Sequence, residues 1–558
     1  MLEGYYIKKI GQNRGVPRVW LEGTQTERAG FKPGQKFDVV VQGHTIVLQA
    51  NPDGSRVVSS KKAGEKQHPV IDLNSRELLA IFDGMSAVRV AVKKGEIYLL
   101  PLASEIKKRE RFNRLREKLE SGEPLTVGSV SHGGGVLSHA IHTGLKEAGI
   151  ATKIGFANEI RGELLEHAAA HNDAWSNDTK VFAAPMQELA FDDRGVAQIP
   201  RVEICELGLP CSGASKAGIA RRGLAHPEAH PEVGHLVVSA LMILSKANAA
   251  VVILENVPNY ANSASADILR NQLRDMGYVT HERILNGKQW GTLENRDRWC
   301  LIAVTDGIEF NFDHLQPPAT RPRRLGDALD PIAPDDPRWS RMEGLKAKEQ
   351  RDLSEGKGFR MQVFNADSEH VGTLTKGYAK VRSTDPKLAH PTNPDLLRQL
   401  TPAEHARVKA VPEHLVDGLS ETIAHEVLGQ SIVYPPFRDV GHHVGNALNR
   451  VVGKAEVPLG DRATVAAPEI PDEVSSLARE VVATFRLADA ARGQYSGVIV
   501  AVDRDVMIQD VGRDEGVIHR LDLLNKQPRL GQTVKIAYEK GRAKVEEKVR
   551  APQMALSL

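Results

Sequence analysis

Two short apolar runs, each leading into polar residues beside a proline, constrain the fold most. The first runs from Val202 to Leu207 and leads into Pro210-Cys211-Ser212. The second runs from Val251 to Leu254 and leads into Glu255-Asn256-Val257-Pro258. Short apolar runs rich in β-branched residues are typical of buried strands in a parallel sheet. Because the carboxyl ends of such strands share one edge, the sequence predicts a thiol and a carboxylate that face one cleft.

The chain around these runs alternates strands with helices from Leu125 onwards, which predicts a doubly wound, Rossmann-like α/β fold. The predicted strand 126–130 ends in Ser131-His132-Gly133-Gly134-Gly135, and a helix from about residue 136 to 148 follows. Glycines at such a turn let a ligand approach the backbone near the helix N-terminus. The next strand ends at Glu159, where a carboxylate is placed to hold a ribose.

Bulk composition narrows the class of protein. At 558 residues the chain is too long for one core, so three or more domains are expected. The formal net charge is only +2, so any nucleic-acid surface must be local. The cysteines, Cys205, Cys211 and Cys300, are too few for a disulfide framework and lack zinc-ligand spacing, which favours a reducing cytosol. The N-terminus lacks a signal-peptide pattern and no apolar run is long enough to span a bilayer, so we expect a cytoplasmic location.

Three later motifs extend the pattern. They are 291–298, which ends in Glu294-Asn295-Arg296-Asp297-Arg298, then 398–408, then Leu428-Gly429-Gln430-Ser431-Ile432. Together with the glycine turn and the two strand ends, their order resembles that of the DNA (cytosine-5-)-methyltransferase family over about residues 125–450. The resemblance implies a methyltransferase core that uses S-adenosylmethionine.

The same resemblance implies roles for four residues. Cys211 adds to C6 of cytosine, so that C5 becomes a nucleophile, and the thiols of Cys205 and Cys300 are expected to be core residues. Glu255 protonates or hydrogen-bonds N3 as a carboxylic acid. Arg298 reaches the base carbonyl and Glu255, while Arg296 meets the backbone or the thiol region. Because the target carbon lies inside the duplex stack, the base must be flipped out.

The residues that match family positions for the methyl donor are Val130, Gly134, Gly135, Glu159, Pro210, Gln430 and Ser431. The chain departs from the family pattern at several places. Val130 replaces an aromatic residue, His132 replaces the first glycine, and Glu294 and Ser212 replace glutamines. We expect the turn around His132 to be the weak point for cofactor affinity.

The region between the catalytic core and the last two motifs is rich in Pro, Arg and Gly, and in the family this is where the target is recognised. The segment 372–378 resembles the centre of short recognition regions. The residues predicted to contact DNA are Arg323, Arg324, Thr373 and Leu374. A disordered insertion is the alternative.

Accessory modules flank this core. In the first hundred residues, a strand, a short helix or turn, and a hairpin occur twice, and this repeat resembles AbrB-type and SymE-like swapped-hairpin barrels. The C-terminal strands resemble Kfr-type β domains. The alternative for each barrel is that it binds no DNA and only packs against a neighbouring domain or partner. The predicted segments are 1–103, the AbrB-like domain; 104–123, a charged, solvated linker helix; 124–304, the catalytic core; 305–395, the target-recognition region; 396–452, the return segment; 453–493, a linker with a helix; and 494–550, a small β-barrel.

The sequence therefore predicts a DNA cytosine-5 methyltransferase that acts on double-stranded DNA, with a restriction or plasmid-maintenance partner and no membrane. Two alternatives remain open. One is an RNA cytosine-5 methyltransferase of similar fold. The other is a DNA-binding regulatory protein whose methyltransferase core has lost turnover, as the AbrB-like barrel and the altered glycine turn suggest.

Overall fold

The computed structural model describes residues 1–63, 66–215, 218–219, 222–318, 323–357, 360–459, 484–488, 493–502, 506–512, 515–539 and 542–547. The chain divides into two compact units, Met1–Gln316 with Arg324–Glu456, and Pro317–Arg323 with Val457–Leu558. This division is coarser than the seven predicted segments, whose boundaries stay predictions. No helix among the described residues is long and apolar enough to cross a bilayer.

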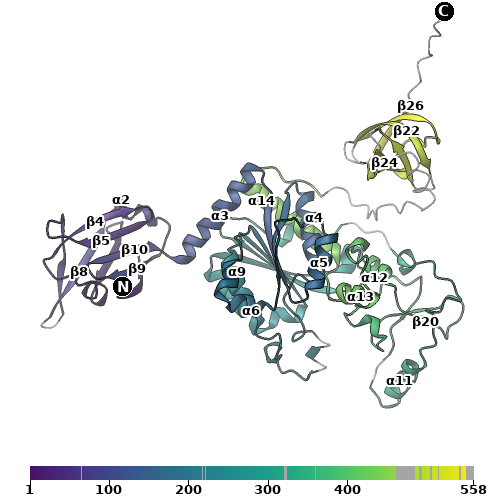
Figure 1. Cartoon of the computed structure of the whole chain (residues 1–558), viewed down its shortest axis with the longest axis horizontal. Helices are drawn as coiled ribbons and strands as arrows, with labels where there is room; N and C mark the ends of the chain where they lie inside the picture. The colour runs from purple at the N-terminus through teal and green to yellow at the C-terminus, as the bar shows by residue number, and fades with distance from the viewer. Residues whose placement is uncertain are drawn as a thin grey trace, which may run out of the picture. The chain divides into compact units, whose positions relative to one another are not determined.

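The N-terminal domain consists of two antiparallel sheets, with strand orders β1-β9-β10-β5-β4-β6 and β2-β3-β8-β7 (Figure 1). Its elements are β1 Gly4–Lys9, β2 Gly11–Asn13, β3 Val16–Glu22, α1 Thr24–Glu27, β4 Lys36–Gln42, β5 Thr45–Ala50, β6 Arg56–Val57, β7 Ser59–Ala63, β8 Lys66–Asn74, α2 Arg76–Leu79, η1 Ala80–Phe82, β9 Ala87–Lys93 and β10 Glu96–Pro101. The predicted repeat is confirmed as β3-α1-β4-β5 followed by β8-α2-β9-β10. The copies pair through β3 with β8 and β5 with β10, so alternate side chains such as Val19, Leu48 and Val90 fill one shared core.

Helix α3, Ala103–Ser121, differs from the solvated linker that its charges predict. Arg111 is fully buried, and its guanidinium donates to the Thr305 hydroxyl at 2.8 Å and to the Met276 and Gly277 carbonyls at 2.9 Å. Other cations of the helix reach the buried Glu203, which lies 2.8 Å from both Arg114 and Lys118. The helix therefore packs on the catalytic sheet, because buried oxygens compensate one side of its charge.

The catalytic core is a seven-stranded sheet in the order β13-β12-β11-β14-β15-β17-β16, parallel from β13 to β15 and antiparallel at β17 and β16. Its strands are β11 Leu125–Val130, β12 Thr152–Glu159, β13 Lys180–Ala183, β14 Ile204–Leu207, β15 Val251–Asn256, β16 Tyr278–Asn286 and β17 Asp297–Thr305. The connecting helices are α4 Val136–Glu147, α5 Gly162–His171, α6 Met186–Phe191, α7 Asp193–Ala197, α9 Leu236–Ala247 and α10 Ala264–Asp275, with turns η2 Pro227–Ala229, η3 Pro258–Asn262 and η4 Gly287–Trp290. The doubly wound α/β prediction is confirmed.

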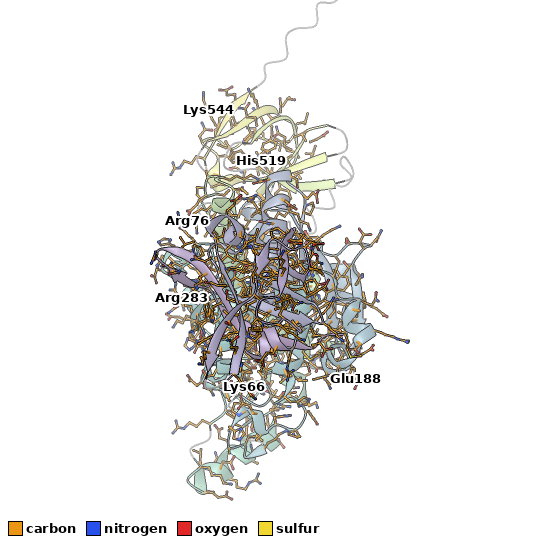
Figure 2. The ribbon with its side chains drawn as sticks, turned by 90° about the vertical axis from the view of Figure 1, so that its left-hand side faces the viewer. Lys66, Arg76, Glu188, Arg283, His519 and Lys544 are labelled. Carbon is orange, nitrogen blue, oxygen red and sulfur yellow. The ribbon has the colours of Figure 1, made fainter. Side chains whose placement is uncertain are left out.

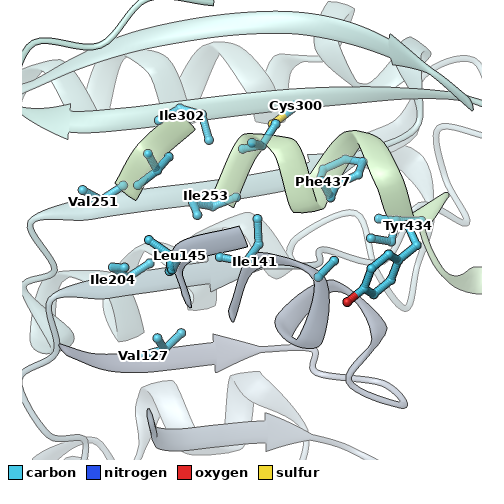
Figure 3. Close-up of a cluster of buried hydrophobic side chains, with 14 of the residues drawn as sticks. Val127, Ile141, Leu145, Ile204, Val251, Ile253, Cys300, Ile302, Tyr434 and Phe437 are labelled. Atoms are coloured by element: carbon cyan, nitrogen blue, oxygen red, sulfur yellow. The ribbon is translucent and has the colours of Figure 1, made fainter. Parts of the chain in front are cut away.

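Each face of this sheet has its own hydrophobic core, because successive residues of a buried strand point to opposite sides. Ile253 faces a cluster that includes Ile141 of α4 and Phe437 of the return helix α14, Tyr434–Val451 (Figure 3). Leu254 faces the other cluster, which is built by α6, α9 and α10. Because both faces are covered, ligands reach the sheet at the carboxyl ends of the parallel strands.

The recognition region and the return segment follow. Their elements are η5 Phe312–His314, η6 Leu325–Ala328, α11 Glu343–Ser354, β18 Val363–Phe364, η7 Tyr378–Lys380, β19 Lys387–Ala389, β20 Leu397–Arg398, α12 Pro402–Val408, η8 Glu413–Leu415, α13 Glu421–Gln430 and α14 Tyr434–Val451. A small core that includes Leu325, Val371, Leu374, Tyr378 and Leu388 holds the recognition region together. The described residues of this region therefore form a packed module, not the disordered insertion that was the alternative.

The second unit contains a six-stranded sheet in the order β21-β24-β23-β22-β25-β26. Its elements are β21 Thr484–Leu487, β22 Gln494–Val502, β23 Val506–Asp510, β24 Glu515–Arg520, η9 Leu521–Leu523, β25 Thr533–Glu539 and β26 Arg542–Glu547. His519, labelled in Figure 2, is buried inside it and stacks on Tyr538 with ring centroids 5.8 Å apart. The helix predicted within 453–493 falls mostly on 460–483, which lie outside the described residues.

Candidate active site

A cavity of about 770 Å³ opens at the carboxyl ends of the parallel strands β11, β12, β14 and β15. Its wall is completed by Lys376 of the recognition region and by residues of α13 and the turn after it. The predicted site residues that line it are Gly134, Glu159, Pro210, Cys211, Glu255, Arg298, Gln430 and Ser431. Val130, Gly135 and Arg296 are not part of the lining. Segments far apart in sequence therefore meet at one site.

The thiol of Cys211 sits on the turn after β14. Its side chain is partly exposed, whereas Cys205 and Cys300 are buried in the two cores, where burial raises the pKa of both thiols. The Cys211 carbonyl accepts hydrogen bonds from the backbone of Ala214 and Ser215, at 2.9 and 2.8 Å, which fixes the turn. A partly exposed thiol near the start of such a turn suits a nucleophile.

Asn256, at the end of β15, ties this turn to the next strand. Its Nδ2 donates to the Leu209 carbonyl at 3.0 Å, and its Oδ1 accepts from Val257 N at 2.9 Å. The thiol loop and the carboxylate strand are thus held in one arrangement by a buried amide.

The Glu255 carboxylate faces the cavity and forms an ion pair with Arg298. Arg298 Nε lies 2.5 Å from Glu255 Oε1, and the two side chains are only 8% and 13% exposed. Arg298 Nη1 also donates to the Asp297 carbonyl at 2.8 Å, so its guanidinium plane is fixed. The arrangement presents a carboxylate and a guanidinium together to a planar, hydrogen-bonding ligand.

Arg296 lies behind the cavity wall rather than in it. Its guanidinium donates to the Leu374 carbonyl at 3.1 Å and to the Gly429 carbonyl at 2.8 Å, and it approaches Glu294 at 3.3 Å. Burial lowers the pKa of Arg296 to about 10. This geometry joins the recognition region to α13.

Lys409 is a member of the same buried network that the sequence does not reveal. Its ammonium lies 3.3 Å from Glu294 Oε2 and donates to the Leu428 carbonyl at 2.6 Å. Both side chains are fully buried. A lysine just past an amphipathic helix normally reads as a surface residue, and only the fold shows that it meets Glu294, which replaces a family glutamine.

The glycine turn between β11 and α4 is held by Glu159, whose Oε2 accepts from Gly133 N at 3.0 Å. Ser131 adopts a φ of 56°, a left-handed conformation that costs a non-glycine residue on the order of 1 kcal/mol and that is often kept at ligand sites. A Cβ on Gly134 would lie 2.5 Å from Val427 Cγ1, so the turn packs directly on α13. At Gly133 and Gly134 the wall of the cavity is therefore made of backbone.

His132, the expected weak point of this turn, is accommodated in the fold. Its ring is largely buried, contacts Trp175 edge-on with centroids 5.4 Å apart, and lies with Nδ1 2.9 Å from Ser129 Oγ. Burial lowers the pKa of His132 to about 4, so the ring is neutral at physiological pH. No charge is therefore added to the turn.

The cavity residues fit S-adenosylmethionine. Glu159 offers a carboxylate for ribose hydroxyls, and Gly133 and Gly134 leave room for close approach to the backbone. Ile160, 64% exposed, and Met186 add apolar surface to the cavity lining, whereas the buried Val130 is not part of it. The sequence missed Ile160 because an exposed isoleucine after a strand carries no pattern.

The residues predicted to contact DNA lie outside the cavity. Arg324 is exposed and lies 3.1 Å from Asp367, and Arg323 is partly buried. Thr373 is exposed and donates through Oγ1 to the Asn295 carbonyl at 3.0 Å, whereas the Leu374 side chain is buried in the recognition-region core. A contact of Leu374 with DNA would have to involve its backbone, and these DNA contacts stay predictions.

The fold and cavity together define a doubly wound α/β protein in which a glycine turn, a thiol and a carboxylate line one cavity at the carboxyl ends of the parallel strands. The family model for C-5 cytosine-specific DNA methylase matches residues 139–446, more than half of the chain. The chain therefore belongs to the C-5 cytosine-specific DNA methylase family. This membership confirms the predicted class, a DNA (cytosine-5-)-methyltransferase, and the predicted cofactor, S-adenosylmethionine.

A second family model, KfrB Domain, matches residues 494–547 and confirms the Kfr-type C-terminal domain. Among curated relatives, the type II methyltransferase M1.ScrFI of Lactococcus lactis subsp. cremoris is 26% identical over 45% of this chain and 64% of its own length. The type II methyltransferase M.NlaX of Neisseria lactamica is 26% identical over 46% of this chain and 80% of its own length. The match to the crystal structure of S. pombe Dnmt2 methyltransferase covers 59% of this chain and 99% of that chain, with 21% identity and a TM-score of 0.46.

Proposed function

We propose that this chain methylates C5 of cytosine in double-stranded DNA through a covalent cysteine adduct. The observation that carries the proposal is the single cavity lined by Cys211, the Glu255–Arg298 ion pair and the glycine turn. Cytosine C5 is a poor nucleophile by itself, so the site must activate the ring before a methyl group is transferred.

In the proposed mechanism, the Cys211 thiolate forms a bond to C6, and the C5–C6 π electrons move to C5 as N3 accepts a proton or hydrogen bond from Glu255. Arg298 holds the Glu255 carboxylate and meets the base carbonyl. S-adenosylmethionine, when bound, would supply the electrophilic methyl group: C5 would form the new C–C bond while the S–CH3 bond breaks, and the electron pair of that bond would stay on the sulfur of the leaving S-adenosylhomocysteine. A base then removes the C5 proton, the C6–S bond breaks, and the electron pair of that C6–S bond returns to Cys211.

The residues proposed to hold the methyl donor are Val130, Gly134, Gly135, Glu159, Pro210, Gln430 and Ser431. Glu159 would accept hydrogen bonds from ribose hydroxyls, and Gln430 and Ser431 close the cavity from the return segment. Val130 and Gly135 support the wall from behind. Arg296 is proposed to act through the backbone that it positions rather than on the base.

Recognition of DNA is proposed for the region between β17 and α12. Arg323, Arg324 and Thr373 are exposed or partly exposed there, and Leu374 would anchor the loop that carries them. Since the reacting carbon is stacked inside a duplex, the cytosine must leave the helix to reach Cys211. No observation favours RNA as the substrate.

The accessory domains are proposed to serve the same substrate. The N-terminal domain resembles AbrB-type barrels, and side chains such as Lys66 and Arg76 lie on it (Figure 2). An excess of lysine and arginine over aspartate and glutamate in this domain would add sequence-independent affinity for DNA. We further propose a restriction or plasmid-maintenance partner and a cytoplasmic location, in which three unpaired thiols stay reduced.

Bisulfite sequencing of DNA from cells that express the full chain tests the proposal. Cytosines of a defined sequence should become resistant with the wild-type protein and stay convertible with Cys211→Ala. Cys205→Ala is the matched control, because its thiol is buried away from the cavity, and it should leave the pattern intact. If the wild-type protein protects no cytosine, the chain is instead the regulatory protein without turnover; trapping by 5-fluorocytosine RNA but not DNA would point to an RNA enzyme.

A further inference from the structure

Among the described residues that line the cavity, three carry a lysine or arginine cation, and two of these are neutralised. Arg161 lies 2.7 Å from Glu163 and 3.1 Å from Glu426. Arg298 pairs with Glu255. The third, Lys376, is exposed and forms no ion pair with a carboxylate of the described residues. It is therefore the cation of this wall that is available to a ligand.

The backbone on which Lys376 stands is fixed from several sides. Leu374 N donates to Glu294 Oε1 at 2.8 Å, and the Leu374 carbonyl accepts from Arg296 at 3.1 Å. On the other side of the loop, the Thr375 hydroxyl donates to Asp385 Oδ1 at 3.2 Å. The Cα position of Lys376 is thus determined by a buried network, although its side chain is long and free to turn.

Helix α13 brings this loop to the cavity. A Cβ on Gly429 would lie 2.3 Å from the Thr375 carbonyl carbon and 2.4 Å from Lys376 N, so the two backbones touch. Gln430 and Ser431, the next residues of the return segment, line the same cavity. Lys376 therefore stands where the recognition region meets the catalytic wall.

We propose that the Lys376 ammonium binds a phosphate of the target strand beside the cytosine that enters the cavity. The inference rests on the proposed function, because a flipped cytosine carries its own sugar-phosphate to the rim as the base approaches Cys211. An ammonium without a carboxylate partner, on a long side chain at the rim of the cavity, can form charge-assisted hydrogen bonds with such a phosphate. The carboxylate of the methyl donor is an anion of similar chemistry, and the test separates the two.

The test compares Lys376→Gln and Lys376→Arg with the wild-type full-length protein. The rate constant kcat/KM for methyl transfer to sheared, unmethylated DNA is measured at several salt concentrations with saturating S-adenosylmethionine. For Lys376→Gln, the slope of log kcat/KM against log salt should become shallower by about one, with about a tenfold loss near 0.1 M salt. Lys376→Arg should keep most of the wild-type slope because it keeps the charge.

Two further measurements complete the design. Lys153→Gln is the matched control, since Lys153 lies at the other end of β12 from Glu159 and pairs with Asp178 at 3.6 Å, and its slope should match the wild type. The affinity for S-adenosylhomocysteine without DNA should be equal in all variants.

An unchanged slope for Lys376→Gln, with an active wild-type protein, would overturn the Lys376 proposal alone. A loss of S-adenosylhomocysteine affinity would overturn it in favour of the cofactor carboxylate. A wild-type protein that is inactive on DNA would overturn the proposed function, and this proposal with it.

Discussion

Arg298 Nε and Glu255 Oε1 lie 2.5 Å apart across the antiparallel strands β17 and β15, at the floor of the cavity. Both side chains are nearly buried, so the ion pair is protected from the screening that weakens surface pairs. The ion pair uses Oε1 of Glu255, and the other carboxylate oxygen, Oε2, has no hydrogen-bond partner among the described residues. In the proposed mechanism this oxygen carries the proton that ring nitrogen N3 of the base accepts.

Replacement of Glu255 by glutamine should lower kcat for methyl transfer by on the order of 10²- to 10⁴-fold, because the amide has no acidic proton to give. Arg298→Ala should also lower kcat, since the Glu255 carboxylate would lose the partner that fixes its orientation. The affinity for S-adenosylhomocysteine should not change in either variant. Single-turnover methyl transfer and equilibrium dialysis measure the two quantities.

A charge-matched control is Glu120→Gln on α3, where Glu120 is 57% exposed and lies 3.5 Å from Arg116. It should leave kcat unchanged. Wild-type kcat in Glu255→Gln would show that this carboxylate takes no part in proton transfer.

The three cysteines should differ sharply in reactivity. Cys211 is partly exposed, whereas Cys205 and Cys300 are buried, and burial raises the pKa of both buried thiols and suppresses their thiolates. In the native protein, Ellman's reagent should therefore label one thiol quickly, and Cys211→Ala should remove that reaction. In denaturant the wild type should show three thiols and the variant two. Rapid labelling of a second native thiol would contradict this assignment.

The thiol and the carboxylate were predictable because each follows a buried strand at the same edge of a parallel sheet, which is a local pattern with a global consequence. The partners of Glu294 were not. Lys409 and Leu374 reach it from 115 and 80 residues away in sequence only after the recognition region and the return segment fold around it. The prediction for helix α3 was wrong for a related reason: Glu203, which pairs with Arg114 and Lys118, lies directly before strand β14, and the charge pattern of the helix does not reveal that contact.

The Glu294–Lys409 pair should be essential to stability, because removing one partner leaves a buried charge. Burial raises the pKa of Glu294, but Lys409 and Arg296 outweigh it and the net shift is downward, so the carboxylate is ionised. Lys409→Met should destabilise the catalytic unit by about 3 kcal/mol. Glu294→Gln with Lys409→Met should recover part of that loss. Denaturant unfolding followed by tryptophan fluorescence measures both, and equal stability of the single and double variants would refute the coupling.

For Glu206, in contrast to Glu294, we expect a carboxyl group that is protonated in the folded protein over part of the physiological pH range. It is buried on β14, neither carboxylate oxygen has a hydrogen-bond partner among the described residues, and burial raises the pKa of Glu206 to about 7. The hydroxyls of Ser138 and Ser129 face it and only partly offset the burial. Because the folded protein holds this proton more tightly than the unfolded chain, the stability that Glu206 contributes is complete below about pH 4.5. That contribution is then lost as pH rises through about 7.

Glu206→Gln should therefore match the wild type near pH 5 and exceed it above pH 7, by about 3 kcal/mol at most. Glu203→Gln, three residues earlier in the sequence, is the matched control. Burial raises the pKa of Glu203, but Lys118 and Thr126 outweigh this effect, so the net shift of its pKa is downward. That variant should be less stable than the wild type at neutral pH, since Arg114 and Lys118 lose their partner. Urea unfolding at pH 5, 6, 7 and 8 follows the two differences. A Glu206→Gln difference that stays constant across this range would mean that the carboxyl does not titrate in the fold, and that the two neighbouring hydroxyls satisfy it.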